Sequence, residues 1–411
     1  MKIIFLSIYF FFFTFCVSAG HMGTGKIERK AKKIHEQILT IDSHNDTPLR
    51  MIRPGFDWGE RHNPYTDRSR VDLIRMEEGG LDGAFFALFI GQGPRTPVGN
   101  EEAKQRVLMV FDTLLNAINH NSDKIGLALT PDDAYRLEKQ RKRIAFIGVE
   151  NGYPVGRDIE MVQTLYDRGA RYITLVHTRN NDICDSSTDT LAFSGLSDFG
   201  NEVVAEMNRL GMMIDVSHAS DSSFYDILRK TRSPVLASHS CSRALCDNPR
   251  NLDDAMLLAL AANNGVIQMC ILSDYVKTPT PNPERDSARA AVREKFRNFD
   301  NLTDEEMKQA HKEWYAIEDQ YPRELATVSD VVDHIDHIID VAGIDHVGIG
   351  TDFDGGGGVT GCYDVSEMGN ITLELVTRGY TKKDIRKIWG GNLMRVMNEN
   401  IRIAKKIAQN R

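Results

Sequence analysis

Short apolar runs recur along the chain from residue 38 onward, and longer stretches with helical spacing separate them. There are eight such runs, at residues 39–43, 83–89, 144–149, 172–176, 212–216, 234–237, 266–271 and 346–350. Strands that alternate with helical segments form parallel βαβ units, and eight such units close into a (β/α)8 barrel. The pattern therefore predicts an α/β protein with a TIM-like barrel, and an open doubly wound sheet is the alternative. No Gly-x-Gly-x-x-Gly motif follows the first run, which argues against a dinucleotide-binding sheet.

The segments between the runs have the apolar spacing of barrel helices. In 160–168, Met161, Leu165 and Tyr166 form an apolar stripe that ends at Gly169. The segment 202–210 repeats this pattern and is followed by Gly211. A glycine at this position supplies the left-handed turn that leads from a helix into the next strand.

The stretch 273–329 interrupts the alternation after the seventh run. It opens with Pro279, Pro281 and Pro283 and continues as charged sequence through Trp314 and Tyr315. We expect a mainly helical insertion that lies over the mouth of the barrel, where it would act as a lid or as a homodimer contact. A solvated excursion without a role in chemistry is an equal alternative. The prediction is thus one barrel domain over residues 20–411, with an insertion at about 273–329.

Residues 1–19 have the pattern of a secretory signal peptide. Lys2 precedes a phenylalanine-rich apolar run that is too short for a comfortable transmembrane helix, and small residues stand at Val17-Ser18-Ala19. We expect cleavage after Ala19, export to the periplasm or the medium, and no membrane span in the mature chain. A lipid anchor at Cys16 is the alternative, but Phe15 is too bulky for such a processing site.

Composition narrows the range of functions. Apolar residues make up 41% and charged residues 26% of the 411 residues, which is ordinary for a folded protein. The net charge of -8 without a basic block argues against nucleic acid as a partner. Beyond the signal there are five cysteines without C-x-x-C spacing, so neither a disulfide framework nor a cysteine zinc site follows.

Residues that carry chemistry follow six of the eight apolar runs. They are His44 with Asp46, then Glu150, His177, His218 and His239, and finally Asp352 with Asp354 beyond it. The strand ends of a barrel converge on one face. Each residue alone has an ordinary structural explanation, but together these imidazoles and carboxylates would be costly to place side by side without a cation.

The donor types point to a metal centre. Imidazoles and carboxylates without a thiolate suit zinc and leave manganese, cobalt or iron possible. We expect two ions, with His44 and Asp46 on one, His218 and His239 on the other, and Glu150 bridging them. Two such ions hold a shared water as hydroxide and polarise a carbonyl, which is hydrolytic chemistry. Asp352 would then shuttle the proton to the departing amine, and His177 would steady the oxyanion or the substrate's carbonyl.

The motifs around these residues resemble the renal (membrane) dipeptidase family of zinc metallopeptidases, and the resemblance suggests a bacterial-type exported member. They are IDSHND at 41–46, GVENG at 148–152, LVH at 175–177, DVSH at 215–218, ASHS at 237–240 and GIGTDFDG at 348–355. They stand in the family's order, with His218 and His239 21 residues apart. The resemblance implies a barrel of the metal-dependent hydrolase type that binds two zinc ions per subunit and cleaves dipeptides. It assigns one zinc to His44, Asp46 and Glu150, and the other to Glu150, His218 and His239.

The resemblance also implies the residues that hold the substrate. His177 and Arg250 match the family's substrate-binding histidine and arginine, and Asp352 matches its aspartate after the eighth strand. A guanidinium at Arg250 suits the terminal carboxylate of a dipeptide, because it can bind both oxygens. Ser43 and Asn151 depart from the family's small residues next to ligands, which puts details of the substrate pocket in doubt.

Two other classes of function remain as alternatives. One is another binuclear amidohydrolase that acts on lactones, cyclic amides or phosphotriesters, but many of these bridge their metals with a carboxylated lysine, and no lysine stands near His177. The other is a barrel that binds peptides without catalysis, which would have no reason to keep Asp352. His334 and His337 are expected to be structural residues on a helix over 331–341.

Overall fold

Eight parallel strands form the centre of the protein. The computed structural model describes residues 18–299 and 302–410. The strands are β1 (Ile41–Asn45), β2 (Gly83–Phe89), β4 (Arg143–Glu150), β5 (Ala170–Thr174), β6 (Met213–Asp215), β7 (Leu236–Ser240), β8 (Val266–Met269) and β9 (Val347–Ile349). Each pairs in parallel with the next in this order. The predicted TIM-like barrel of eight strands is therefore confirmed.

The barrel closes between its first and last strands. A parallel bridge joins Asn45 to Phe353, just beyond β9. The buried hydroxyl of Ser43 donates to the carbonyl oxygens of Ser238 at 2.6 Å and Ile349 at 3.2 Å, so it ties β1 to β7 and β9. One further strand was not predicted: β3 (Ile125–Leu127) pairs with the start of β4 and has only three residues, too few for a periodic signal.

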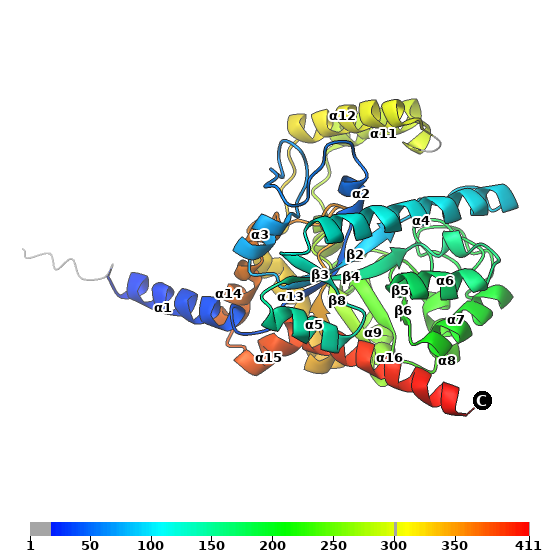
Figure 1. Ribbon diagram of the computed structural model, residues 1–411. Helices are drawn as coiled ribbons and strands as arrows, with labels where there is room; N and C mark the ends of the chain where they lie inside the picture. The colour runs from blue at the N-terminus through cyan, green and yellow to red at the C-terminus, as the bar shows by residue number, and fades with distance from the viewer. Residues whose placement is uncertain (1–17, 300–301, 411) are drawn as a thin grey trace, which may run out of the picture.

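Helices surround the strands in Figure 1. They are α3 (Leu73–Glu78), α4 (Pro97–His120), α5 (Pro131–Lys139), α6 (Glu160–Arg168), α7 (Asp198–Leu210), α8 (Asp221–Lys230), α9 (Asp254–Ala262), α13 (Val328–Ala342), α14 (Gly369–Thr377), α15 (Lys382–Arg386) and α16 (Asn392–Gln409). Short turns are η1 (Tyr153–Val155), η3 (Ile344–His346), η4 (Val365–Glu367) and η5 (Lys387–Gly391). The predicted segments 160–168 and 202–210 lie in α6 and α7. Gly169 (φ 119°) and Gly211 (φ 78°) end them in the left-handed conformation, as expected.

The inside of the barrel is filled by large side chains below the strand ends. The ring of Phe85 stacks on Phe146 at 4.6 Å and on Tyr172 at 5.2 Å between ring centres. Leu393 and Met397 of α16 belong to the same apolar cluster. Each fully buried side chain of this size contributes roughly 1.5–3 kcal/mol of transfer free energy. The polar residues at the strand ends are therefore supported from below by closely packed apolar side chains.

The stretch 273–329 holds a pair of helices that stand apart from the barrel. After α10 (Ser273–Val276), α11 (Pro283–Lys295), η2 (Arg297–Phe299) and α12 (Asp304–Gln320) follow, and α11 and α12 lie side by side in Figure 1, near the short α2 (Pro48–Met51). Their apolar cluster is separate from the barrel core and contains Val292, Phe296, Ala310 and Ile317. The pair is thus a small unit with its own core.

The predicted signal peptide, including Cys16, falls almost entirely outside the described residues. Helix α1 (Ser18–His35) contacts α14 and extends to one side in Figure 1. Within the described part of the chain, no helix combines the length and the apolar character needed to cross a membrane. The five cysteines after the signal are all buried and unpaired with one another.

Candidate metal centre

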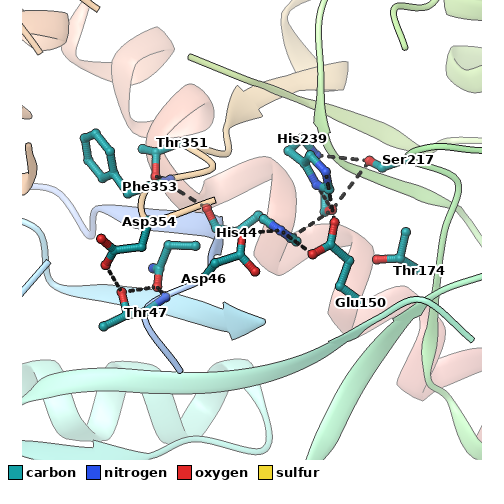
Figure 2. Close-up of polar contacts among 12 residues, drawn as sticks. His44, Asp46, Thr47, Glu150, Thr174, Ser217, His239, Thr351, Phe353 and Asp354 are labelled. Atoms are coloured by element: carbon teal, nitrogen blue, oxygen red, sulfur yellow. Dashed lines mark hydrogen bonds and ion pairs between the residues drawn. The ribbon is translucent and has the colours of Figure 1, made fainter. Parts of the chain in front are cut away.

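The strand ends bring the predicted chemical residues together. His44 lies on β1, Glu150 ends β4, and His239 lies on β7. His177 and His218 each follow a strand by three residues, and Asp352 follows β9 by three. Figure 2 shows the side chains of His44, Asp46, Glu150 and His239 gathered in one place.

The carboxylate of Glu150 lies at the centre of this group. Its Oε1 atom is 3.2 Å from Nε2 of His218, 3.5 Å from Nε2 of His239 and 3.6 Å from Nε2 of His177. Its Oε2 atom is 3.6 Å from Nε2 of His44. The Nε2 atoms of His218 and His239 are 3.0 Å apart. One buried carboxylate therefore faces four imidazole nitrogens.

These distances fit ligands that share a cation. Two donors about 2.1 Å from a tetrahedral ion lie about 3.4 Å apart, close to the separations around Glu150. Two buried atoms of these residues also lack a hydrogen-bond partner among the described residues: His44 Nε2 and Asp46 Oδ1. A buried polar atom without a partner is costly, and a metal ion removes that cost for a ligand atom. The residues therefore fit a metal centre.

The donor atoms fall into three groups within 4.8 Å, which are His44 with Glu150 and His239, Glu150 with His177 and His218, and His44 with Asp46 and Asp352. These groups differ from the assignment of ligands to two ions that the sequence predicted, because His218 and His239 fall in different groups. His177 joins a group although it was assigned to the substrate, and Asp352 joins one although it was assigned to proton transfer. The division of the ligands between two ions stays a prediction.

Tyr172 orients His44. Its hydroxyl oxygen lies 2.8 Å from Nδ1 of His44 and 3.3 Å from the carbonyl oxygen of Ser43. If the Tyr172 hydroxyl donates to Ser43, it accepts the Nδ1 proton of His44, which leaves the Nε2 lone pair facing Glu150. Sequence reasoning missed Tyr172, because nothing in its strand distinguishes it from a core tyrosine.

Ser238 and Asp215 orient His239 in the same way. Nδ1 of His239 is 2.8 Å from the Ser238 hydroxyl, which donates to Asp215 at 2.6 Å. Asp215 also accepts from the backbone nitrogen of Ser217 and from the hydroxyl of Thr174. Such partners fix the tautomer and raise the basicity of a metal ligand. The positions of Asp215 and Ser238 within the ligand motifs were the available signal.

Burial keeps three of the histidines neutral. Together with the nearby Arg250 guanidinium, it lowers the pKa of His177 to about 3. It also lowers the pKa values of His218 and His239 well below the usual range. Neutral imidazole is the form that binds a metal. At these three histidines the electrostatics therefore favour ligation over protonation.

The backbone at the strand ends is strained. His218, Asp352 and Asp354 have φ values of 68°, 58° and 66°, a region that residues other than glycine rarely adopt. Next to them, a Cβ atom at Gly355 would overlap the carboxylates of Asp46 and Asp352. The loop after β9 thus passes close to the centre.

Asp354 points away from the centre, toward Thr47 in Figure 2. It accepts hydrogen bonds from the Thr47 hydroxyl at 3.0 Å, from Arg50 Nε at 3.2 Å and from the Arg70 backbone at 2.8 Å. This carboxylate connects loops around the barrel mouth.

The two histidines on α13 have structural partners, as predicted. His334 contacts Ser242 and Val276, and His337 contacts Asp254.

Arg250 is buried beside the centre, with 4% of its surface exposed. It donates to the carbonyl oxygen of His239 at 3.2 Å, and its guanidinium lies 5.3 Å from the centre of the Tyr275 ring. Its Nε atom has no partner among the described residues. The guanidinium keeps donor capacity for a further group.

An eight-stranded parallel barrel with histidine and carboxylate donors at its strand ends is an arrangement typical of metal-dependent hydrolases. Residues 28–411 match the model of the membrane dipeptidase family, peptidase family M19. The chain belongs to this family of metallopeptidases and is a dipeptidase by class. The predicted family is confirmed, whereas the bacterial-type exported character of the protein stays a prediction.

Known proteins similar to this chain extend over most of its length. Dipeptidase tcpJ of Claviceps purpurea is 29% identical over 91% of this chain and 81% of its own. An uncharacterized dipeptidase of Schizosaccharomyces pombe is 30% identical over 93% of this chain and 85% of its own. The crystal structure of the probable dipeptidase PvdM from Pseudomonas aeruginosa is 31% identical, covers 92% of this chain and 99% of that chain, and superposes with a TM-score of 0.80.

Proposed function

We propose that this protein hydrolyses the peptide bond of dipeptides with two zinc ions, and that it holds the substrate's terminal carboxylate with Arg250. The observation that carries the proposal is the carboxylate of Glu150, which faces Nε2 atoms of four histidines within 3.2–3.6 Å. A carboxylate has two oxygens and can therefore serve two cations at once.

His44, Asp46 and Glu150 would hold one ion, and Glu150, His218 and His239 the other. Such ions depress the pKa of a water molecule to near neutrality and polarise a carbonyl group. The protein itself orients the ligands. Tyr172 and Ser238 fix His44 and His239 in one tautomer, and the apolar side chains packed beneath them hold the ligands in position.

Asp352 is the proposed proton carrier. Burial raises the pKa of its carboxyl well above the usual range, and the neighbouring Cys270 and Asp46 raise it further. A carboxyl with a raised pKa can take a proton from the attacking water and give it to the departing amine near neutral pH. One carboxylate oxygen of Asp352 lies within 4.8 Å of donor atoms of His44 and Asp46, so this carboxyl is next to the proposed ions.

His177 and Arg250 are the proposed substrate contacts. His177 is a neutral imidazole against the ring of Phe89, with 4.6 Å between ring centres, so it donates a hydrogen bond without adding a charge. That suits a carbonyl oxygen of the substrate, whose negative charge grows during attack. Arg250 supplies the fixed positive charge for the terminal carboxylate.

A panel of dipeptides assayed with zinc present tests the proposal, and it includes L-L and L-D pairs. We expect hydrolysis of at least part of the panel, abolished by a chelator and restored by added zinc. A protein with its full complement of metal that cleaves no dipeptide would contradict the proposal. Turnover of lactones or cyclic amides instead would favour the other amidohydrolase chemistry.

We further propose that residues 1–19 direct the protein out of the cytoplasm. Support comes from the apolar run after Lys2 and the small residues before position 20. Sequencing the amino terminus of the mature protein tests this, and a first residue at position 20 is the expected result. Recovery of an amino terminus lipidated at Cys16 would favour the anchored alternative.

A further inference from the structure

A pocket of about 890 Å³ opens between the helical insertion and the barrel mouth. Trp314 and Tyr315 of α12 and Arg293 of α11 line one side, and Arg70 and Tyr363 line the other. Small-molecule sites typically span about 300–1,000 Å³. This pocket is therefore large enough for much more than the two backbone units and short side chains of a simple dipeptide.

The pocket lies next to the metal centre. Gly355 and Gly356 line it. The same two glycines abut the centre, because a Cβ at Gly355 would overlap the carboxylates of Asp46 and Asp352, and one at Gly356 would lie 3.5 Å from Asp352 Oδ2. Only Gly355 and Gly356, which have no side chains, are shared by the pocket lining and the edge of the centre, so a substituent on a substrate at the centre would pass them to enter the pocket.

Five carboxylates line the pocket, and all but Glu367, which accepts from the Tyr363 backbone nitrogen, are paired with arginines. The pairs are Asp319 with Arg68 at 2.9 Å, Glu318 with Arg289 and with Arg323 at 3.4 Å, Asp274 with Arg323 at 2.7 Å, and Asp354 with Arg50 at 3.2 Å. These acids therefore offer little net negative charge to a ligand.

Two arginines of the pocket have no acidic partner. Among the described residues, no carboxylate lies within ion-pair distance of the guanidinium of Arg70 or of Arg293. Arg70 stands 4.1 Å from the centre of the Tyr363 ring and bonds only carbonyl oxygens, those of Gly357 and Tyr363. Arg293 stands 5.0 Å from the centre of the Trp314 ring. Both bonds of Arg70 are made by Nη1, so its Nε and Nη2 donors, like the in-plane donors of Arg293, can bind an anion.

We infer that this pocket selects dipeptides that carry a bulky acidic substituent, whose carboxylate Arg70 and Arg293 bind while the aromatic rings pack against its chain. The inference rests on the proposed dipeptidase function, and it adds the class of substrate. Arginine is suited to this task because it binds a carboxylate through two parallel N–H donors.

Matched substrates test the inference. One dipeptide contains Nε-succinyl-lysine and the other its neutral amide, Nε-succinamoyl-lysine, each placed in turn at either position beside alanine. In one position we expect the wild-type kcat/KM to be about tenfold higher for the acid than for the amide, the effect of one charged hydrogen bond. Arg70→Gln and Arg293→Gln should each remove most of this preference. Arg106→Gln, an exposed arginine of α4 outside the pocket, should keep it.

Tryptophan fluorescence gives a second readout that needs no turnover. Trp314 lines the pocket, whereas Trp58 and Trp389 are buried. Free Nε-succinyl-lysine should change the fluorescence of the wild-type metalloenzyme in a saturable way, the amide should not, and Trp314→Phe should abolish the signal.

Each outcome of the two experiments decides a question. Hydrolysis of both substrates with equal kcat/KM overturns the acidic preference and leaves the dipeptidase function standing. A fluorescence change by the acid alone, without hydrolysis of any dipeptide, upholds the pocket and overturns the function. An acid preference that survives in both arginine variants also overturns the inference.

Discussion

Nδ1 of His44 lies 2.8 Å from the hydroxyl oxygen of Tyr172, inside the barrel and below the metal centre. The bond holds the imidazole so that Nε2 faces Glu150. Partners of this kind typically change metal affinity by about 10–100-fold when they are removed. Tyr172→Phe should therefore weaken zinc binding by about that factor, while the phenyl ring preserves the stack on Phe85.

Competition with a zinc indicator measures this effect. Tyr153→Phe is the control, because it too removes the hydroxyl of a buried tyrosine, one that donates at 2.7 Å to the carbonyl oxygen of Pro94 and does not contact the ligands. Equal zinc affinity in wild type and Tyr172→Phe would show that Tyr172 does not orient His44.

Substitution of Asp352 should impair catalysis, whereas substitution of Asp354 should lower stability. Asp352→Asn removes the proton carrier, so kcat should fall by about 10²–10⁴-fold with little change in the melting temperature. Asp354→Asn weakens the bonds to Thr47 and to the buried Arg50, and it should lower the free energy of unfolding by about 3 kcal/mol. Steady-state kinetics and thermal unfolding distinguish the two. Wild-type kcat in Asp352→Asn would exclude proton transfer by this residue.

Arg250 should act mainly on substrate binding. Arg250→Lys keeps the charge but loses the planar fork, so kcat/KM for ordinary dipeptides should fall by about 10–100-fold. Dipeptides with a terminal carboxamide should be poor substrates of both proteins and should show little difference between them. If Arg250→Lys lowers turnover of acid and amide equally, the guanidinium does not bind the terminal carboxylate.

The two-ion arrangement predicts a specific defect in His44→Ala. At limiting zinc this variant should lose one of two ions by elemental analysis, together with nearly all hydrolysis, because the bridging carboxylate of Glu150 then serves a single cation. Wild-type protein stripped with a chelator should regain activity in step with zinc added up to the second equivalent. Full activity of His44→Ala at limiting zinc would rule out the two-ion arrangement.

His35 should make stability depend on pH. Burial lowers its pKa below the usual value, and its Nδ1 and Nε2 atoms are bonded to Thr372 at 2.7 Å and to the Gly79 carbonyl at 2.9 Å. The folded state then binds fewer protons than the unfolded state, whose histidine titrates near about 6.5. Stability should fall as pH drops through that value, by at most about 1.4 kcal/mol per pH unit.

Denaturant unfolding between pH 7.5 and 5.5 checks the sign of this effect. His35→Gln can keep both hydrogen bonds without titrating, so its stability should change less over this interval than that of the wild type. His120→Gln, an exposed histidine at the end of α4, should behave as the wild type. A wild-type slope unchanged in His35→Gln would assign the pH dependence to other groups.

Hydrophobic patterning was sufficient to predict the barrel. The strand β2 coincides with the predicted run 83–89, and α6 with the predicted helix 160–168. The strand β3 was not predicted, because three residues are too few to show a periodic pattern of apolar positions. The pattern predicts the barrel because parallel strands that are buried on both faces appear in the sequence as continuous apolar runs. The helices that cover them appear as segments with apolar residues on one face.

The sequence by itself determined the parallel barrel, the family and the residues at the strand ends, since each depends on short-range order along the chain. The tertiary structure alone decided which atoms meet: that Glu150 faces four histidines, that Tyr172 and Asp215 stand behind the ligands, and that Arg70 and Arg293 share a pocket. These contacts join residues tens to hundreds of positions apart. Their geometry depends on barrel closure and side-chain packing, which no local pattern encodes.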